Sequence, residues 1–218
     1  MPARVVRWWY ARSSIGGMQI DVESDDGKRC IFDVDTTTAE QFQLSVGREL
    51  SADELARLEQ VHTALGFIRR MQRFLAHRLR SSGEVAQRLR TLGATHEHIA
   101  LALDLLRGNG VINDERFAYA YVRDCVRLGT RSAQAIRRKL VAAGIAPDLA
   151  DRALTAEYPA DLDMQRARSL ARKTLRHLRN ATPEQRYRRI RDRLVRQGFP
   201  PETVRSILRE MMDSAEHP

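Results

Sequence analysis

The sequence predicts a mainly α-helical protein: three tandem three-helix modules in an elongated array, preceded by a small β-hairpin and a short helix. Three observations support this prediction. From residue 51 onward, apolar residues recur with a period near 3.6, the period of an α-helix. One phrase occurs three times along the chain, at 88–103, 139–154 and 193–208, which indicates a repeated helical unit. Before these helices, one stretch alternates apolar and polar residues as strands do.

That stretch, MQIDVESDDGKRCIFDV (residues 18–34), is expected to form the β-hairpin. If Asp25, Asp26 and Gly27 make a three-residue loop closed by a left-handed glycine, the apolar residues share one face. The facing pairs are then Val22 with Cys30, Ile20 with Phe32 and Met18 with Val34. A two-residue loop would shift the register by one and mix apolar with polar residues on both faces, so the three-residue loop is preferred.

Three aromatic residues, Trp8, Trp9 and Tyr10, precede the hairpin. An isolated hairpin is only marginally stable, so this one should pack on a helix. We expect the three aromatic side chains to supply that packing. The alternative is that they form an exposed stacking or interface patch.

Two capping boxes follow the hairpin. Thr37 with Glu40 predicts the start of a short helix, and Ser51 with Glu54 predicts the start of a longer one. The longer helix carries an apolar stripe at helical spacing, made of Leu55, Leu58, Val61 and Leu65.

The repeated phrase predicts a helix, a tight turn and a second helix. Its copies are RLRTLGATHEHIALAL (88–103), KLVAAGIAPDLADRAL (139–154) and RLVRQGFPPETVRSIL (193–208). We expect Gly93, Gly144 and Gly198 at C′, where the left-handed conformation that ends a helix favours glycine. A histidine or a proline then opens the second helix, and an acidic residue follows at the positive end of its dipole.

A further helix precedes each pair, and the joints carry helix-start signals at Ser81, Asp114 and Thr182. Because helix groups of this size bury little apolar surface alone, neighbouring modules should share cores. The alternative is a single compact nine-helix globule. The predicted division is an N-terminal extension of residues 1–66, followed by three modules: residues 67–113, 114–161 and 162–214.

The net charge of +9 is unevenly distributed along the chain. It is −4 over residues 1–66, +5 over residues 67–163 and +8 over residues 164–218. A strongly basic C-terminal part indicates an anionic partner, either nucleic acid or an acidic protein surface. Arginine outnumbers lysine 34 to 3, a bias that genomic base composition alone can produce, so arginine richness by itself identifies no partner.

Most of this positive charge lies on the middle helix of each module. The candidate binding residues are Arg88 and Arg90 in the first module, Arg137, Arg138 and Lys139 in the second, and Arg186, Arg189, Arg193 and Arg196 in the third. The last four follow i, i+3, i+7, i+10 spacing, so they form one stripe opposite or beside the apolar stripe of Ile190 and Leu194. The other interpretation is an ordinary solvated charged face.

Several classes of function have no support in the sequence. No apolar run reaches the length of about 18 residues that a membrane span needs, and the N-terminus lacks the apolar core of a secretory signal, so a cytoplasmic protein is expected. Cys30 and Cys125 have no metal-type spacing, and His96 and His98 point about 200° apart on a helix, so neither pair predicts a metal site. No glycine-rich phosphate loop is present. We expect no cofactor and no enzymatic activity.

Sequence-specific DNA reading by a helix-turn-helix motif is also disfavoured. The second helix of such a motif offers its N-terminal residues to the major groove. Here those turns read THEHI, APDLA and PPETV, which place acidic residues toward the phosphates and offer no arginine to a guanine.

The second module resembles a known family. GVINDERFAYAYVRD (110–124), followed later in the chain by IRRKLVAAGI (136–145), is similar to the RecX family, which are bacterial regulators of the RecA recombinase. RLRSSGEVAQRLRTLG and RLVRQGF fit the family's first and third modules, so the resemblance covers about residues 67–212. The hairpin and short helix look like an N-terminal extension that some members carry. The segment that precedes Met18 matches no feature of the family.

The resemblance implies a curved, crescent-like array of three-helix modules that binds as a monomer in the groove of the RecA–DNA filament. Such proteins oppose ATP hydrolysis, strand exchange and the autocleavage of the LexA repressor, and so modulate recombination, DNA repair and the SOS response. The alternative function is non-sequence-specific binding of single- or double-stranded DNA through the basic C-terminal module, without RecA.

Overall fold

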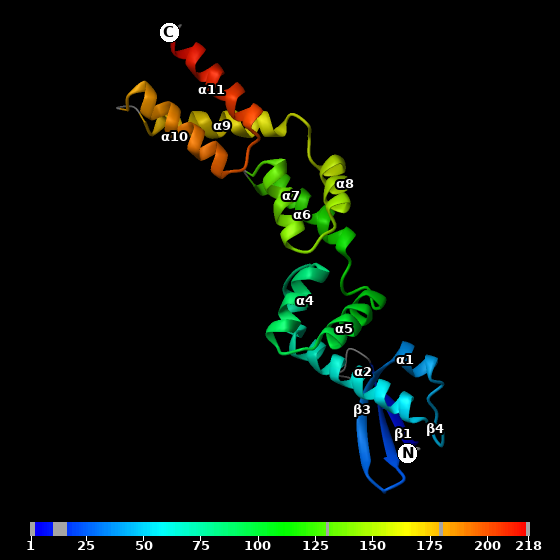
Figure 1. Cartoon of the computed structure of the whole chain (residues 1–218). Coiled ribbons are helices and arrows are strands. Elements are labelled where there is room, and N and C mark those ends of the chain that lie inside the picture. Colours follow the sequence, from blue (N-terminus) through cyan, green and yellow to red (C-terminus); the bar gives the residue numbers. More distant parts are fainter. Residues whose placement is uncertain (1–2, 11–16, 130, 179–180, 217–218) are drawn as a thin grey trace. The chain divides into compact units, whose positions relative to one another are not determined.

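A computed structural model describes residues 3–10, 17–129, 131–178 and 181–216, with side chains as far as residue 211 (Figure 1). The chain forms two compact units, Met1–Asn113 and Asp114–Pro218. The first unit combines a small sheet with helices and the second is helical. The expected fold class, mainly helical with a small N-terminal β-element, is therefore confirmed.

The first unit begins with a four-stranded antiparallel sheet of strand order β3-β2-β1-β4. Its strands are β1 (Ala3–Tyr10), β2 (Gly17–Ser24), β3 (Arg29–Asp35) and β4 (Glu49–Leu50). The predicted hairpin register is confirmed for all three pairs: Met18 with Val34, Ile20 with Phe32 and Val22 with Cys30. Gly27 has φ +75 and closes the loop, as the three-residue turn requires.

The expectation that Trp8, Trp9 and Tyr10 pack the hairpin onto a helix is wrong. They lie in β1, which pairs with β2, and the side chains of Trp8 and Tyr10 are 40% and 70% exposed. The rings of Trp8 and Tyr10 pack edge to face with their centroids 5.5 Å apart. The Arg7 guanidinium carbon lies 4.6 Å from the Trp9 ring centroid. A register shift between Val5 and Arg7 breaks the alternation that would have revealed the strand.

The short helix α1 (Thr36–Gln41) is present, but its predicted capping box is wrong. The N-cap is Asp35, whose carboxylate accepts the backbone N–H of Thr38 at 3.0 Å, so Thr37 lies inside the helix. The box predicted at Ser51 and Glu54 is confirmed at the start of α2 (Ala52–Arg70).

Helix α2 belongs to two cores at once. Leu58 packs with the sheet residues, while Val61, Leu65 and Ile68 pack with the next helices, which are α3 (Gln72–His77), α4 (Ser82–Thr91) and α5 (His96–Gly108). The boundary expected after residue 66 falls inside this continuous helix. The division into four domains therefore stays a prediction, since one helix stabilises both halves of the first unit.

The second unit consists of two three-helix modules. One comprises α6 (Asp114–Leu128), α7 (Ala133–Ala142) and α8 (Pro147–Glu157), and the other α9 (Leu162–Arg176), α10 (Pro183–Arg196) and α11 (Pro201–Glu216). The α6–α8 module buries Phe117, Val122, Ile136 and Leu140, among others. The other buries Ala167, Ala171, Ile190, Leu194 and Phe199, among others, where α9, α10 and α11 pack on one another.

The three glycine turns have the predicted geometry. Gly93, Gly144 and Gly198 have φ values of +86, +84 and +82. In each turn the N–H after the glycine donates back to a carbonyl in the last turn of the preceding helix, as from Ile145 to Leu140 at 3.1 Å. This bond is the mark of a Schellman ending, so the repeat is a helix-ending device that the chain uses three times.

The two modules of the second unit cap each other's helix ends. Ser132, which is fully buried at the start of α7, accepts the N–H of Ala135 and donates its hydroxyl to the carbonyl of Gly198 at 2.5 Å. Asp163 of α9 accepts the N–H of Ala133 at 3.0 Å and the hydroxyl of Tyr158 at 2.5 Å. Burial, together with this bond to a carboxylate, raises the pKa of Tyr158, so its hydroxyl remains a donor.

Arg166 of α9 completes this joint. One of its terminal nitrogens donates to the carbonyls of Cys125 and Val126 at 2.7 Å each, in the last turn of α6, and the other donates to the carbonyl of Arg131 at 2.8 Å. The last carbonyls of a helix have no partner within the helix. A side chain from the neighbouring module supplies it here, so the two modules depend on each other.

Replacing Arg166 with Met should therefore destabilise the second unit as a whole. The change removes three N–H···O bonds, although the carbonyl of Cys125 keeps the N–H of Gly129 and the carbonyl of Arg131 keeps the hydroxyl of Tyr158. We expect the free energy of unfolding to fall by about 2 kcal/mol. Urea denaturation followed by far-UV circular dichroism measures this. Arg152→Met is the matched control, because among the described residues Arg152 makes only an exposed i,i+4 ion pair with Asp148. Equal unfolding midpoints for the two variants would show that the Arg166 bonds contribute no stability.

Candidate partner-binding surface

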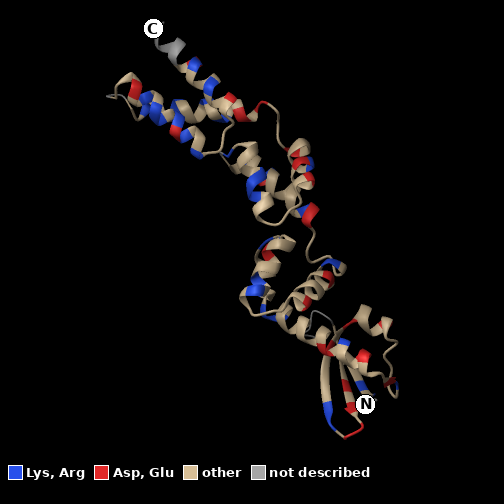
Figure 2. Cartoon of the chain, viewed as in Figure 1, with Lys and Arg blue, Asp and Glu red and all other residues tan. Residues whose placement is uncertain are grey.

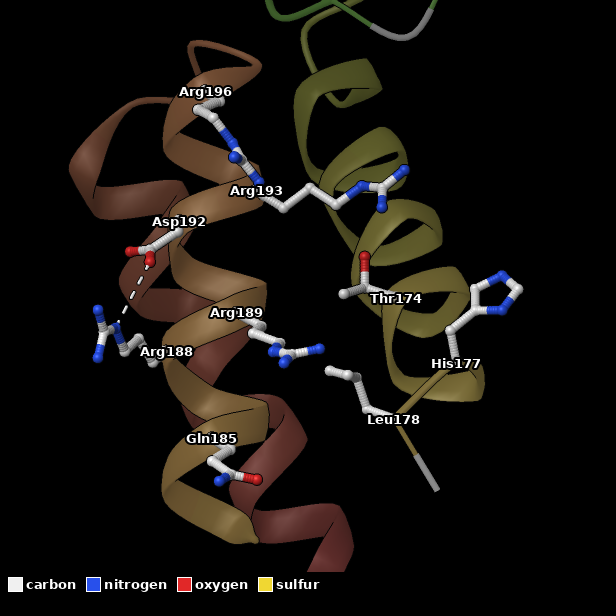
Figure 3. Close-up of a pocket in the computed structure, with 9 residues that line it drawn as sticks. All are labelled: Thr174, His177, Leu178, Gln185, Arg188, Arg189, Asp192, Arg193 and Arg196. Atoms are coloured by element: carbon white, nitrogen blue, oxygen red, sulfur yellow. Dashed lines mark ion pairs between the residues drawn. The ribbon is translucent and has the colours of Figure 1, made fainter. Parts of the chain in front are cut away.

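The basic stripe of the third module lies on α10. A capping box of Thr182 and Gln185 starts this helix, with Pro183 at its first position, as predicted. Ile190 and Leu194 are buried toward the module core. The stripe lies beside this apolar face rather than opposite it, because Arg189 and Arg193 extend toward α9 (Figure 3).

Arg189, Arg193 and Arg196 line a groove of about 700 Å³ between α9 and α10 (Figure 3). The groove is completed by Thr174, His177 and Leu178 from the end of α9 and the residues that follow it, and by Gln185, Arg188 and Asp192 from α10. Its walls are thus two helices whose backbone groups are bonded internally, and its lining is predominantly polar.

The three arginines of this groove are not neutralised within the protein. Arg189, Arg193 and Arg196 make no ion pair or hydrogen bond with any residue that the structure describes. The carboxylate of Asp192 is engaged by other arginines, at 3.0 Å from Arg191 and 3.9 Å from Arg188. The groove lining holds four arginines against one carboxylate, Asp192, so its net charge is positive and it should attract anions.

Two other predicted binding residues, Arg186 and Arg137, make contacts within the protein. Arg186 is half-buried, and its Nε donates to the carbonyl of Leu178 at 3.2 Å, which ties the start of α10 to the end of α9. Arg137 forms a two-point ion pair with Asp151 of α8, at 2.6 and 2.9 Å. This pair raises the pKa of Arg137 and lowers the pKa of Asp151.

The remaining predicted residues lie outside the groove lining. Arg138 is close to the third module, because a Cβ added at Gly198 would stand 2.6 Å from its guanidinium. Lys139 is exposed on α7. Arg88 and Arg90 are exposed on α4 in the other unit, where Arg90 donates to the Gln87 side chain at 3.2 Å. The structure thus brings together three of the predicted residues as unpaired charges.

The rest of the groove lining was not predicted to bind a partner: Thr174, His177, Leu178, Gln185, Arg188 and Asp192. The sequence holds one signal for these residues. The connection between α9 and α10 is short, and a short connection makes two helices antiparallel neighbours. The last turn of α9 must then face the first turns of α10, which places the side chains around residue 177 opposite those around residues 185–189.

Figure 2 shows basic residues along the helices of the third module and mixed charge on the N-terminal sheet and helices. Within the described part of the chain, no group of three His, Cys, Asp or Glu side chains could hold a metal ion. His98 lies at the N-terminus of α5, where its Nδ1 is 2.8 Å from the Thr95 hydroxyl. None of the described helices is both long and apolar enough to span a membrane.

Comparison with known proteins places these modules in a family. Residues 113–154 match the family model described as RecX, second three-helix domain, and residues 161–208 match RecX, third three-helix domain. The chain is 34% identical over 189 residues to "Regulatory protein RecX" of Geobacillus kaustophilus, an alignment that covers 87% of this chain and 70% of the relative. It is 27% identical over 197 residues to the protein of the same name from Geobacillus sp. strain WCH70, covering 90% and 72%.

Solved structures agree with the sequence matches. A crystal structure of regulatory protein RecX superimposes with a TM-score of 0.72 and 25% identity, covering 94% of this chain and 98% of that one. A RecX structure from Lactobacillus salivarius superimposes with a TM-score of 0.54 over 73% of this chain and 97% of that one, and at 24% identity it supports the fold alone. Because a relative at 34% identity aligns over most of both chains and two family models match successive modules, this chain belongs to the RecX family.

Proposed function

We propose that this protein is a cytoplasmic regulator that binds the RecA–DNA filament and inhibits RecA. The observation that carries the proposal is the alignment, over 87% of the chain, with a relative named regulatory protein RecX. The activities that it would oppose are ATP hydrolysis, strand exchange and the LexA coprotease function. Through them it would modulate recombination, DNA repair and the SOS response.

The physical properties of the chain support this proposal. A filament is a repeating polymer whose protein subunits surround an anionic strand, so a ligand gains affinity by touching several points at once. This chain carries repeated three-helix modules and, in the last of them, three unpaired guanidinium groups in one groove. Inhibition would follow because a protein bound across adjoining subunits opposes the changes between them that hydrolysis and strand exchange require.

The test is to add the purified protein to RecA assembled on single-stranded DNA. At equimolar ratio to RecA we expect ATP hydrolysis and strand exchange to fall severalfold, and the protein to sediment with the filament. A control without DNA separates binding to the filament from binding to free RecA. Unchanged ATP hydrolysis and strand exchange at equimolar and higher ratios would contradict the proposal.

A further inference from the structure

We infer that the groove between α9 and α10 is a binding site for the phosphodiester backbone of a nucleic-acid strand, with Arg189, Arg193 and Arg196 as its phosphate ligands. This deepens the proposed function, because it names which part of a protein–DNA filament the third module would contact. It does not require RecA, since the ligand is the nucleic acid itself.

The first support is charge that nothing else in the structure uses. Guanidinium groups bind phosphate oxygens through two parallel N–H bonds, and a guanidinium already paired with a carboxylate is unavailable for this. Arg137 is occupied in this way by Asp151, whereas Arg189, Arg193 and Arg196 have no partner among the described residues. Asp192, the carboxylate in the groove lining, is engaged by Arg188 and Arg191.

The second support is spacing. Along a helix that rises 1.5 Å per residue, Arg193 is about 6 Å beyond Arg189 and Arg196 is about 4.5 Å beyond Arg193. The three therefore extend over about 10.5 Å. One strand of duplex DNA presents a phosphate about every 3.4 Å of helix axis, so this length matches about three spacings between successive phosphates. A regularly charged polymer fits such a row better than a single small anion does.

The third support is what the groove lacks for other ligands. Among the described residues its lining contains no Phe, Tyr or Trp side chain on which a base could stack, and His177 supplies a smaller ring. Its walls are helices, so it offers no free strand edge to an extended peptide, and Leu178, which is 7% exposed, provides little apolar surface for a peptide side chain. Contacts limited to the backbone should make binding independent of base sequence.

Fluorescence anisotropy with labelled 20-nucleotide single strands and duplexes, without RecA, tests this inference between 50 and 200 mM salt. The dependence of log K on log salt has a slope of about −0.9 per phosphate contact for duplex DNA and about −0.7 for single strands. Arg189→Ala/Arg193→Ala should therefore reduce the steepness of the slope by about 1.8 on duplex and about 1.4 on single strands, with a loss of affinity of about tenfold or more at 50 mM salt.

The matched control is Arg205→Ala/Arg209→Ala on α11. These two arginines are exposed, stand at the same i,i+4 spacing and lie outside the groove lining. Their replacement removes the same charge. It should change the slope of log K against log salt by less than the value expected for one phosphate contact. Equal losses in the two variants would overturn the inference, because net charge and not the groove would then determine binding.

Two further results would also overturn it. The first is a competition result. If polyglutamate displaces labelled DNA as effectively as an unlabelled DNA strand of equal charge does, the ligand is an acidic protein. A single strand bound more than tenfold tighter than the duplex would indicate contacts to bases. The inference and the proposed function fail separately: Arg189→Ala/Arg193→Ala with unchanged DNA affinity overturns the first, while intact DNA binding without any inhibition of RecA overturns the second.

Discussion

Replacing Arg189, Arg193 and Arg196 together with glutamate should weaken binding to the RecA–DNA filament by about 100-fold or more. Each change removes a guanidinium that has no partner within the described protein and introduces a carboxylate that repels phosphate. A loss of 100-fold corresponds to about 2.7 kcal/mol, which is modest for three reversed contacts to a polyanion. Co-sedimentation with preassembled filaments at several protein concentrations measures the change.

Helicity of this variant should remain that of the parent, because the three side chains flank the core without entering it. Arg205→Glu/Arg209→Glu again provides the control, since it reverses charge on the neighbouring helix without altering the groove. If the triple variant binds the filament as tightly as the parent, the stripe on α10 is an ordinary solvated face.

Gly198→Ala should lower the free energy of unfolding of the second unit by about 2–5 kcal/mol. Its left-handed backbone, with φ +82, costs a residue with a side chain about 1–2 kcal/mol. In addition, the new Cβ would stand 2.9 Å from the Cβ of Ala135 and 3.2 Å from the hydroxyl of Ser132, both on the neighbouring module. Overpacking of this kind typically adds about 1–3 kcal/mol.

Gly93→Ala separates the two contributions to this loss. Gly93 occupies the same position of the repeat with φ +86, but a Cβ there would meet no atom within 4 Å. We expect this variant to lose only the backbone contribution of about 1–2 kcal/mol, measured on the unfolding of the first unit. Equal losses for the two variants would show that the contact between the modules of the second unit does not resist the added methyl group.

The parts of the fold that the sequence predicts are those that local chemistry determines. The hairpin register follows from strict alternation and a glycine loop, and the three turns follow from the need for a left-handed residue at Gly93, Gly144 and Gly198. The cap at Asp35 was mistaken for one at Thr37 because several residues there can cap, and only the packed helix selects between them.

The contacts that escaped prediction join residues far apart in the sequence. Ser132 and Gly198 are 66 residues apart, and Arg166 lies 41 residues from Cys125. Neither pair leaves a local pattern. Strand β1 was missed because its pairing with β2 passes through a register shift. Long-range pairing of this sort depends on how the helices and strands pack against one another. The periodicity of apolar residues therefore cannot predict it.

The candidate site shows the same limit. The sequence does not show whether a given arginine will form an ion pair or a hydrogen bond with another residue in the folded protein. Arg137 meets Asp151 of another helix and Arg186 meets a carbonyl, whereas Arg189, Arg193 and Arg196 have no partner among the described residues and line a groove. Of the four stripe residues, Arg189, Arg193 and Arg196 line the groove and Arg186 does not. The α9 wall of the groove could be inferred only from the short connection between α9 and α10.

The mutual capping of the last two modules has a consequence for how such proteins can change during evolution or in engineering. Copies of one repeat are often treated as independent structural units that can be deleted, added or exchanged. Here a chain cut after Glu157 would lose Arg166 and Asp163, and would leave helix ends of the preceding module exposed. An exchanged third module would need an arginine and an acid at the same places. These repeats are therefore alike in sequence but are not interchangeable parts.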